Sequence, residues 1–299
     1  MRVLHPDNID TSQTKGILVI LAAILMFSGV DVLNKVLGQQ MSVVQILWAR
    51  FVLFVPIALF LAYTPGKSIR WRSQKPTLQG IRACLLVVEM GMFVYALKFL
   101  PLADMQAILA MAPLMVVVLS IPILGEKVGW RRWSSVALGF CGVLIIIKPG
   151  FSEINMGTWI ALGGMILWSF YCILLRIVGQ VDRAATTAVW TSIIGLILTS
   201  LVIPWYWVTP SIDGWWLLLA IALLGCMGHV TFMHAFTLAP ASLLQPFTYV
   251  QIVIVTFLGW FFFQEIPQAS TLFGAGLIVL AGIYSFHRSK VLAEGDDNR

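Results

Sequence analysis

Residues 16–38, GILVILAAILMFSGVDVLNKVLG, form an almost wholly apolar stretch. A helix needs about 20 such residues to cross the hydrocarbon core of a bilayer. The stretch recurs without a gap at residues 157–179, GTWIALGGMILWSFYCILLRIVG. Identical or related residues coincide at these positions: Leu21/Leu162, Ser28/Ser169, Leu33/Leu174 and Lys35/Arg176. The chain therefore contains a repeated, membrane-crossing unit.

The match continues along both halves of the chain. Residues 95–106, YALKFLPLADMQ, correspond to residues 234–245, HAFTLAPASLLQ, and Gly125-Glu126 corresponds to Gln264-Glu265. The offset stays between 139 and 142 residues throughout. We predict the following organisation: a tail at 1–15, a first repeat at 16–150, a second repeat at 151–288 and a tail at 289–299.

The composition places most of the chain in lipid. Sixty percent of the 299 residues are hydrophobic, only 11% are charged, and the mean hydropathy is +0.92. A soluble domain has roughly 25% charged residues. Short alternating segments typical of a membrane β-barrel are absent from the sequence, so we expect an all-α integral membrane protein. Ten apolar segments are predicted to span the membrane: 16–37, 43–63, 77–99, 102–124, 133–148, 156–178, 184–205, 214–238, 241–263 and 270–287.

Five spans in each copy make an odd number, so the second copy must enter the membrane from the opposite face. The charges of corresponding loops in the two repeats agree with this inversion. The loop at 64–76 has four basic residues and its counterpart at 208–213 has none, while the loop at 125–132 has three and its counterpart at 264–269 has none. Inverted repeats of this kind place a binding site near the bilayer midplane.

The formal charge of +6 orients the protein and does not indicate a nucleic-acid partner. Of the 19 basic residues, 14 fall on one side of the ten-helix arrangement and three on the other. Basic residues concentrate on the cytoplasmic side of membrane proteins. We therefore expect a multi-pass protein of the cell inner membrane with both termini in the cytoplasm.

These features resemble a known family. The inverted ten-helix pattern, Pro101 and Pro240 at helix ends, and the Glu126 and Glu265 motifs are similar to the drug/metabolite transporter superfamily with two EamA-type domains. The stretches DVLNKVLG at 31–38 and WARF at 48–51 resemble bacterial S-adenosylmethionine and riboflavin uptake carriers. The resemblance implies a compact carrier with a central cavity, often a homodimer.

Three ionisable residues inside predicted spans occur in one repeat only: Asp31, Arg50 and Glu89. Their counterparts are approximately Cys172, Ser192 and Gly228. Charged groups at this depth cost at least about 2.5 kcal/mol, so they face a cavity or a partner. Asp31 and Arg50 lie about 10 Å below the same boundary, which favours an ion pair, either in packing or beside a substrate. Glu89 lies near mid-bilayer, where burial disfavours the charged form and proton uptake or binding of a cationic group is expected.

Other polar residues are weaker candidates. Glu126 and Glu265 occur in both repeats and are interpreted as structural. His229 lies almost opposite Glu89 in the repeat and could relay protons or simply bond a neighbouring helix. His229, Glu89 and Cys226 do not have metal-ligand spacing, so we expect neither a metal nor a cofactor. Aromatic and amide residues that could stack on and bond a planar substrate are Trp48, Tyr95, Gln106, Trp168, Tyr171, Gln245, Tyr249 and Gln251.

The leading hypothesis is a secondary active transporter for a small polar or amphipathic metabolite, such as an amino acid, vitamin or nucleoside-like compound. It would work by alternating access, by proton coupling or exchange. The sequence has no P-loop, which disfavours ATP-driven pumping by this chain. An intramembrane enzyme or a channel is the alternative, but His-Glu-x-x-His and Gly-x-Ser-x-Gly motifs are absent from the sequence.

Overall fold

The computed structural model describes residues 6–63, 71–125, 130–147, 155–238 and 247–297. Within these ranges the chain is helical and forms no β-strand. The helices are α1 (Pro6–Gln40), α2 (Val43–Ala62), α3 (Pro76–Ala96), α4 (Leu102–Leu109), α5 (Ala112–Leu124), α6 (Trp130–Ile147), α7 (Met156–Gly179), α8 (Ala184–Val202), α9 (Ile212–Leu238), α11 (Val250–Phe263) and α12 (Ala269–Asp297), with a short 3₁₀ turn, η1, at Ile203–Trp205.

The prediction of ten membrane-crossing helices is confirmed. In the described ranges, seven helical stretches have the length and apolar character needed to cross a bilayer, counting α4 and α5 as one. Three shorter apolar helices, Val136–Ile147, Val250–Phe263 and Ala269–Tyr284, complete the predicted set. The fold is an all-α membrane bundle.

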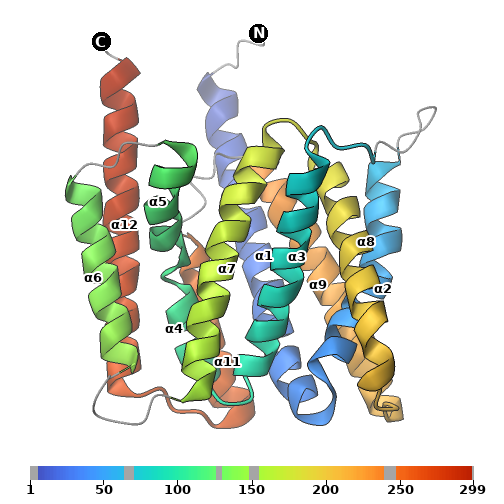
Figure 1. Ribbon diagram of the computed structural model, residues 1–299. Helices are drawn as coiled ribbons and strands as arrows, with labels where there is room; N and C mark the ends of the chain where they lie inside the picture. The colour runs from blue at the N-terminus through green and yellow to red at the C-terminus, as the bar shows by residue number, and fades with distance from the viewer. Residues whose placement is uncertain (1–5, 64–70, 126–129, 148–154, 239–246, 298–299) are drawn as a thin grey trace.

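Matched helices of the two repeats run in opposite directions. In Figure 1, α1 descends from the upper end of the bundle, whereas its counterpart α7 rises toward that end. The start of α1 and the end of α12 both lie at this upper end, which we call the terminus end. The repeat also holds at the level of the backbone, because the matched residues Gly125 and Gln264 both cap their helices in the left-handed conformation, with φ of 69° and 56°. Gln264 is the only non-glycine residue with positive φ in the described ranges.

The fourth span of the first repeat is broken rather than continuous. Pro113 lies in the first turn of α5 and has no N–H to donate to the carbonyl of Leu109. The helix therefore ends at Leu109 and restarts at Ala112. In the second repeat a turn at Tyr249 precedes α11. Breaks at these depths are tolerated where neighbouring helices satisfy the backbone.

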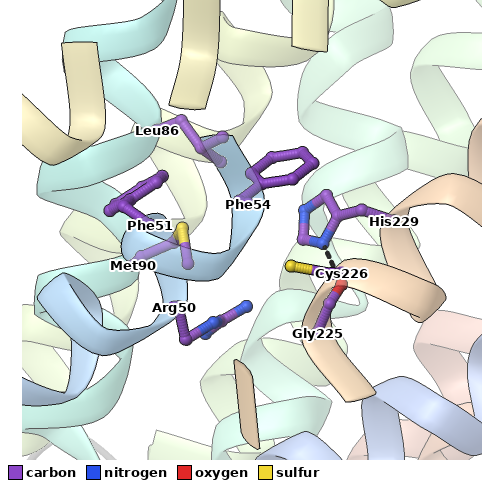
Figure 2. A pocket seen from close by; sticks show the side chains of 8 residues that line it. All are labelled: Arg50, Phe51, Phe54, Leu86, Met90, Gly225, Cys226 and His229. Atoms are coloured by element: carbon purple, nitrogen blue, oxygen red, sulfur yellow. Dashed lines mark hydrogen bonds between the residues drawn. The ribbon is translucent and has the colours of Figure 1, made fainter. Parts of the chain in front are cut away.

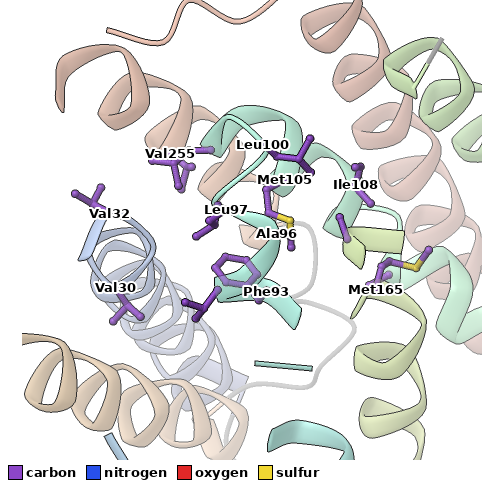
Figure 3. Close-up of a cluster of buried hydrophobic side chains, with 14 of the residues drawn as sticks. Val30, Val32, Phe93, Ala96, Leu97, Leu100, Met105, Ile108, Met165 and Val255 are labelled. Carbon is purple, nitrogen blue, oxygen red and sulfur yellow. The ribbon is translucent and has the colours of Figure 1, made fainter. Parts of the chain in front are cut away.

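Helix packing follows the repeat. The first helix of each copy packs on the third helix of the other, α1 on α9 and α7 on α3. The second helices, α2 and α8, pack on each other, as do the fifth helices, α6 and α12. A central apolar cluster joins the copies, with Val30 on α1, Phe93 on α3, Met165 on α7 and Val255 on α11 among its members (Figure 3).

The surface of the bundle is apolar, as a bilayer demands, and several polar side chains are buried among the apolar residues of its interior. Phe60 and Val253 are 77% and 70% exposed, whereas Gln79 and Arg82 are fully buried. Exposed aromatic residues follow α8 and begin α9 at the end opposite the termini: Trp205, Tyr206, Trp207, Trp215 and Trp216. Tryptophan and tyrosine favour the membrane–water interface, so these residues form the expected aromatic belt.

Candidate functional site

Asp31 lies in the middle of the bundle, where helices of both repeats meet. Its side chain is 6% exposed and belongs to α1. The carboxylate Oδ2 accepts hydrogen bonds from Gln106 Nε2 of α4 at 2.7 Å and from Gln251 Nε2 of α11 at 3.0 Å. Asp31 is therefore held by the broken fourth helix of the first repeat and by its counterpart in the second.

Arg50 of α2 lines a small cavity between the repeats. The other lining residues are Phe51, Phe54, Leu86, Met90, Gly225, Cys226 and His229 (Figure 2). Gly225 allows a close approach here, because a Cβ at that position would lie 3.2 Å from Arg50 Nε and would press on the guanidinium. The cavity encloses about 20 Å³, which is room for about one water molecule. A metabolite would require the helices around it to separate.

Arg50 and Glu89 are buried without a hydrogen-bonding partner among the described residues. Arg50 is 9% exposed and Glu89, on α3, is 5% exposed. In the described part of the chain, neither side chain makes a hydrogen bond or an ion pair. Arg50 still interacts electrostatically with both Asp31 and Glu89. Asp31, Arg50 and Glu89 thus form a cluster of ionisable side chains, which we call the central charges. Arg50 and Glu89 of this cluster can still form hydrogen bonds, as a ligand site requires.

The expected ion pair between Asp31 and Arg50 is wrong for this conformation. Asp31 Oδ2 instead accepts hydrogen bonds from two glutamine amides, and Arg50 interacts with the carboxylate only electrostatically, beyond ion-pair distance. Across the described ranges, the one ion pair joins Lys35 to Glu265. Glu265 Oε2 also accepts the Leu102 N–H at 3.0 Å, and Lys35 donates to the Leu100 carbonyl at 3.1 Å. These bonds tie the repeats together at the end opposite the termini.

His229 takes a defined tautomer in the cavity wall. Its Nδ1 lies 3.0 Å from the carbonyl of Gly225, and a carbonyl can only accept, so Nδ1 carries the hydrogen. The ring packs edge-on against Phe27, with centroids 5.1 Å apart. Among the described residues, no group of three His, Cys, Asp or Glu is placed to hold a metal ion.

The predicted aromatic residues divide between two settings. Trp168 and Tyr171 of α7 stack with ring centroids 5.1 Å apart, and Tyr171 is 8% exposed. Tyr249 is also buried, and its hydroxyl has no partner in the described ranges. Trp48 bonds Ser200 at 3.0 Å near the aromatic belt, and Tyr95 is 44% exposed beside an open apolar groove. Trp48 and Tyr95 therefore lie apart from the central charges. Gln245 lies outside the described residues.

Two residues contribute more to the structure than their sequence pattern indicates. Gln251 was named only among the amides, yet it is one of the two donors to Asp31. Arg82 of α3 was not a site candidate, yet it is fully buried in a network at the terminus end. The sequence does contain a signal for Arg82, because its positive charge occurs in one repeat only. With offsets of 139 to 142 residues, its counterparts in the second repeat are all apolar: Ile221, Ala222, Leu223 and Leu224.

Comparison with known proteins gives consistent matches over most of the chain. The EamA-like transporter family matches twice, at residues 14–148 and 155–286. An S-adenosylmethionine uptake transporter of Rickettsia felis is 25% identical, over 95% of this chain and 96% of its own length. A riboflavin transporter of Vibrio cholerae is 26% identical, over 89% and 91%, and the pseudopaline exporter CntI of Pseudomonas aeruginosa is 27% identical, over 90% and 94%.

A solved structure shares the fold. It is a crystal structure of a protein 18% identical to this chain, with a TM-score of 0.65 over 93% of this chain and 99% of that one. At 18% identity, the structural similarity supports the fold and carries no information about function.

Proposed function

Because the chain belongs to the EamA-like transporter family, we propose that it is a secondary active carrier of a small charged metabolite. Asp31, Arg50 and Glu89 would bind the metabolite near mid-bilayer, and the two repeats would open alternately to either face. The terminus end faces the cytoplasm of the inner membrane in this proposal, since most basic residues belong to that side. The observation that carries it is the pair of buried, unbonded side chains, Arg50 and Glu89.

The charge of the central group supports a substrate with a positive group. Two carboxylates and one guanidinium leave one negative charge uncompensated when all three are ionised. An uncompensated charge is costly in a low-dielectric interior, so either a cationic group of the substrate or a proton would balance it. A carboxylate of the same substrate would bind Arg50. S-adenosylmethionine, with an ammonium, a sulfonium and a carboxylate, carries one net positive charge and fits this pattern. A zwitterionic amino acid is neutral overall and would fit only together with a proton on Glu89. A proton on Glu89 would also replace the substrate on the return step.

The closed state of the cavity supports a carrier over a channel. A cavity of about 20 Å³ cannot hold a metabolite, so each transport cycle must enlarge it by moving helices. Inter-repeat bonds are present at both ends, at Lys35–Glu265 and around Asp182. Alternating access would break the inter-repeat bonds at one end of the bundle while those at the other end stay formed.

Competitive uptake tests the proposal. Cells that overproduce the protein would take up labelled S-adenosylmethionine, with riboflavin, aromatic amino acids and their amine analogues as competitors. We expect saturable uptake, inhibited by compounds with a cationic group and weakly or not at all by riboflavin. Uptake that fails to saturate would contradict the carrier, and preference for uncharged compounds would contradict the charge argument.

A further inference from the structure

A chain of hydrogen bonds joins the repeats at the terminus end. Asp182, in the loop between α7 and α8, accepts bonds from the Ser73 hydroxyl, the Gln74 N–H at 2.9 Å and Gln79 Nε2 at 2.8 Å. Gln79 Nε2 also donates to Thr187 Oγ1 of α8 at 3.1 Å. The start of α3 is thereby fixed to the second repeat.

Arg82 extends this chain by one turn toward the bundle centre. Its Nε donates to Gln79 Oε1 at 3.1 Å. Its Nη2 donates to the Thr187 carbonyl at 3.1 Å and to Thr191 Oγ1 at 2.7 Å. These bonds use Nε and Nη2, and they account for Arg82 as a tether between α3 and α8.

The remaining nitrogen of Arg82 has no such explanation. Nη1 is buried and has no hydrogen-bond partner in the described part of the chain. Arg82 makes no ion pair within the same ranges, and Asp182 reaches it only through the Gln79 side chain. A buried guanidinium with two unused N–H donors is costly, and a planar carboxylate is the group that complements it best.

Aromatic rings lie on the α7 side of this guanidinium. Arg82 Cζ is 5.3 Å from the centroid of Tyr171, which stacks on Trp168. The ring face stabilises the cation, and the Tyr171 side chain also interacts with the guanidinium at hydrogen-bonding range, although Nη1 has no partner at bonding geometry in the described part of the chain. The surroundings of Arg82 therefore offer a flat apolar surface together with free donors, which suits a small organic anion more than a hydrated inorganic ion.

Arg82 lies one helical turn before a residue that lines the central cavity. Arg82, Leu86 and Glu89 are spaced by four and three residues and share the buried face of α3. Leu86 lines the cavity that holds Arg50. A ligand that moves from this cavity toward the terminus end along α3 would meet Arg82 next.

We propose that Arg82 is a second anion-binding residue of the transport path, distinct from the central charges. When the ends of α3 and α8 separate, Nη1 binds the carboxylate of the metabolite after that group has left Arg50. This inference rests on the proposed carrier function and assigns a chemical class, organic carboxylates, to the inner part of the path.

Ligand pairs that differ by one carboxylate test this assignment. The pairs are S-adenosylmethionine with its decarboxylated analogue, and tryptophan with tryptamine. Equilibrium binding is measured on the purified full-length protein in detergent. We expect the wild type to prefer the carboxylate member of at least one pair. Arg82→Met should weaken binding of that member about tenfold and change binding of its partner less than about twofold, because one charge-assisted bonded pair is lost.

Thr191→Val is the matched control. It removes the 2.7 Å bond to Nη2 and leaves Nη1 untouched, so the carboxylate preference should persist. If Arg82→Met and Thr191→Val weaken both members of a pair equally, Arg82 is only a tether and the inference is wrong. If Arg82→Met does not yield monodisperse protein, Arg82→Gln replaces it, and an unchanged preference in Arg82→Gln overturns the subsite, since glutamine keeps a polar amide but carries no charge.

The two proposals fail in different ways. A wild type that binds none of the four compounds overturns the charged-metabolite carrier together with its inner subsite. A wild type that binds with a carboxylate preference, retained in full by Arg82→Met, overturns the subsite alone.

Discussion

The Gln106 amide donates a 2.7 Å hydrogen bond to the Asp31 carboxylate and so joins α1 to the broken fourth helix. Because Gln251 of α11 donates to the same oxygen, the bonds of Asp31 are supplied by both repeats. Arg50 and Glu89 lack such protein partners in the described ranges. The position of Asp31 therefore depends on both repeats, while Arg50 and Glu89 are available to a ligand in the proposed carrier.

We predict that Glu89→Gln weakens transport and flattens its pH dependence without changing protein abundance. Glutamine keeps the size of the side chain but cannot exchange a proton or balance a cationic group. Uptake rates from pH 5 to 8, with membrane levels followed by immunoblot, measure the effect. Wild-type rates across this range in the variant would end the assignment of Glu89.

The Lys35–Glu265 pair should stabilise the bundle cooperatively. Lys35 is 7% exposed, so removing Glu265 leaves a buried cation without its counter-ion. We expect Glu265→Gln and Lys35→Met each to lower stability, and the double variant to lose less than the sum. The coupling should be about 0.5–3 kcal/mol, measured by SDS-induced unfolding of the four proteins. Strictly additive losses would show that the pair is not an energetic unit.

Asp182 should make the terminus end sensitive to acid. Partial burial acts to raise its pKa, but bonds from Ser73, Gln74 and Gln79 outweigh burial and hold the pKa below the ordinary value. A folded-state pKa below the unfolded one gives stability that is present above the unfolded pKa and lost as pH falls through the folded pKa. The wild type should therefore melt at a higher temperature than Asp182→Asn at pH 6, and the difference between the two melting temperatures should shrink toward pH 3. A difference that is constant with pH would contradict this.

Gly274 and Gly276 offer a matched test of packing between α6 and α12. A Cβ at Gly274 would lie 2.5 Å from the Gly142 carbonyl oxygen. A Cβ at Gly276 would meet no atom of the described neighbours within 4 Å. Gly274→Ala should destabilise the protein by about 1–3 kcal/mol, and Gly276→Ala should not. Unfolding in SDS measures both, and equal stabilities of the two variants would contradict the packing.

The architecture could be predicted from the sequence because lipid imposes simple rules. The length of the apolar segments identifies the helices, and repeated sequence such as 16–38 and 157–179 shows which helix of one repeat matches which helix of the other. The break at Pro113 was harder, since proline is tolerated in many membrane helices and only the packing decides whether the helix ends. Depth along a helix placed Asp31 and Arg50 at the same level, but it carried no information about which face each occupies. The two glutamines that bond Asp31 lie on helices distant in sequence, so depth along a helix could not identify them as its partners.

Saturable counterflow in proteoliposomes tests the carrier most directly. Vesicles loaded with unlabelled S-adenosylmethionine should accumulate the labelled compound transiently from outside, with protein containing Arg50→Met showing little accumulation and the exposed control Arg183→Met retaining it. Transient overshoot arises because a carrier must bind substrate to reorient, which neither a channel nor an enzyme requires. Flux that equilibrates without overshoot, rises linearly with concentration, or is unchanged in Arg50→Met would contradict a carrier that binds its substrate at the central charges.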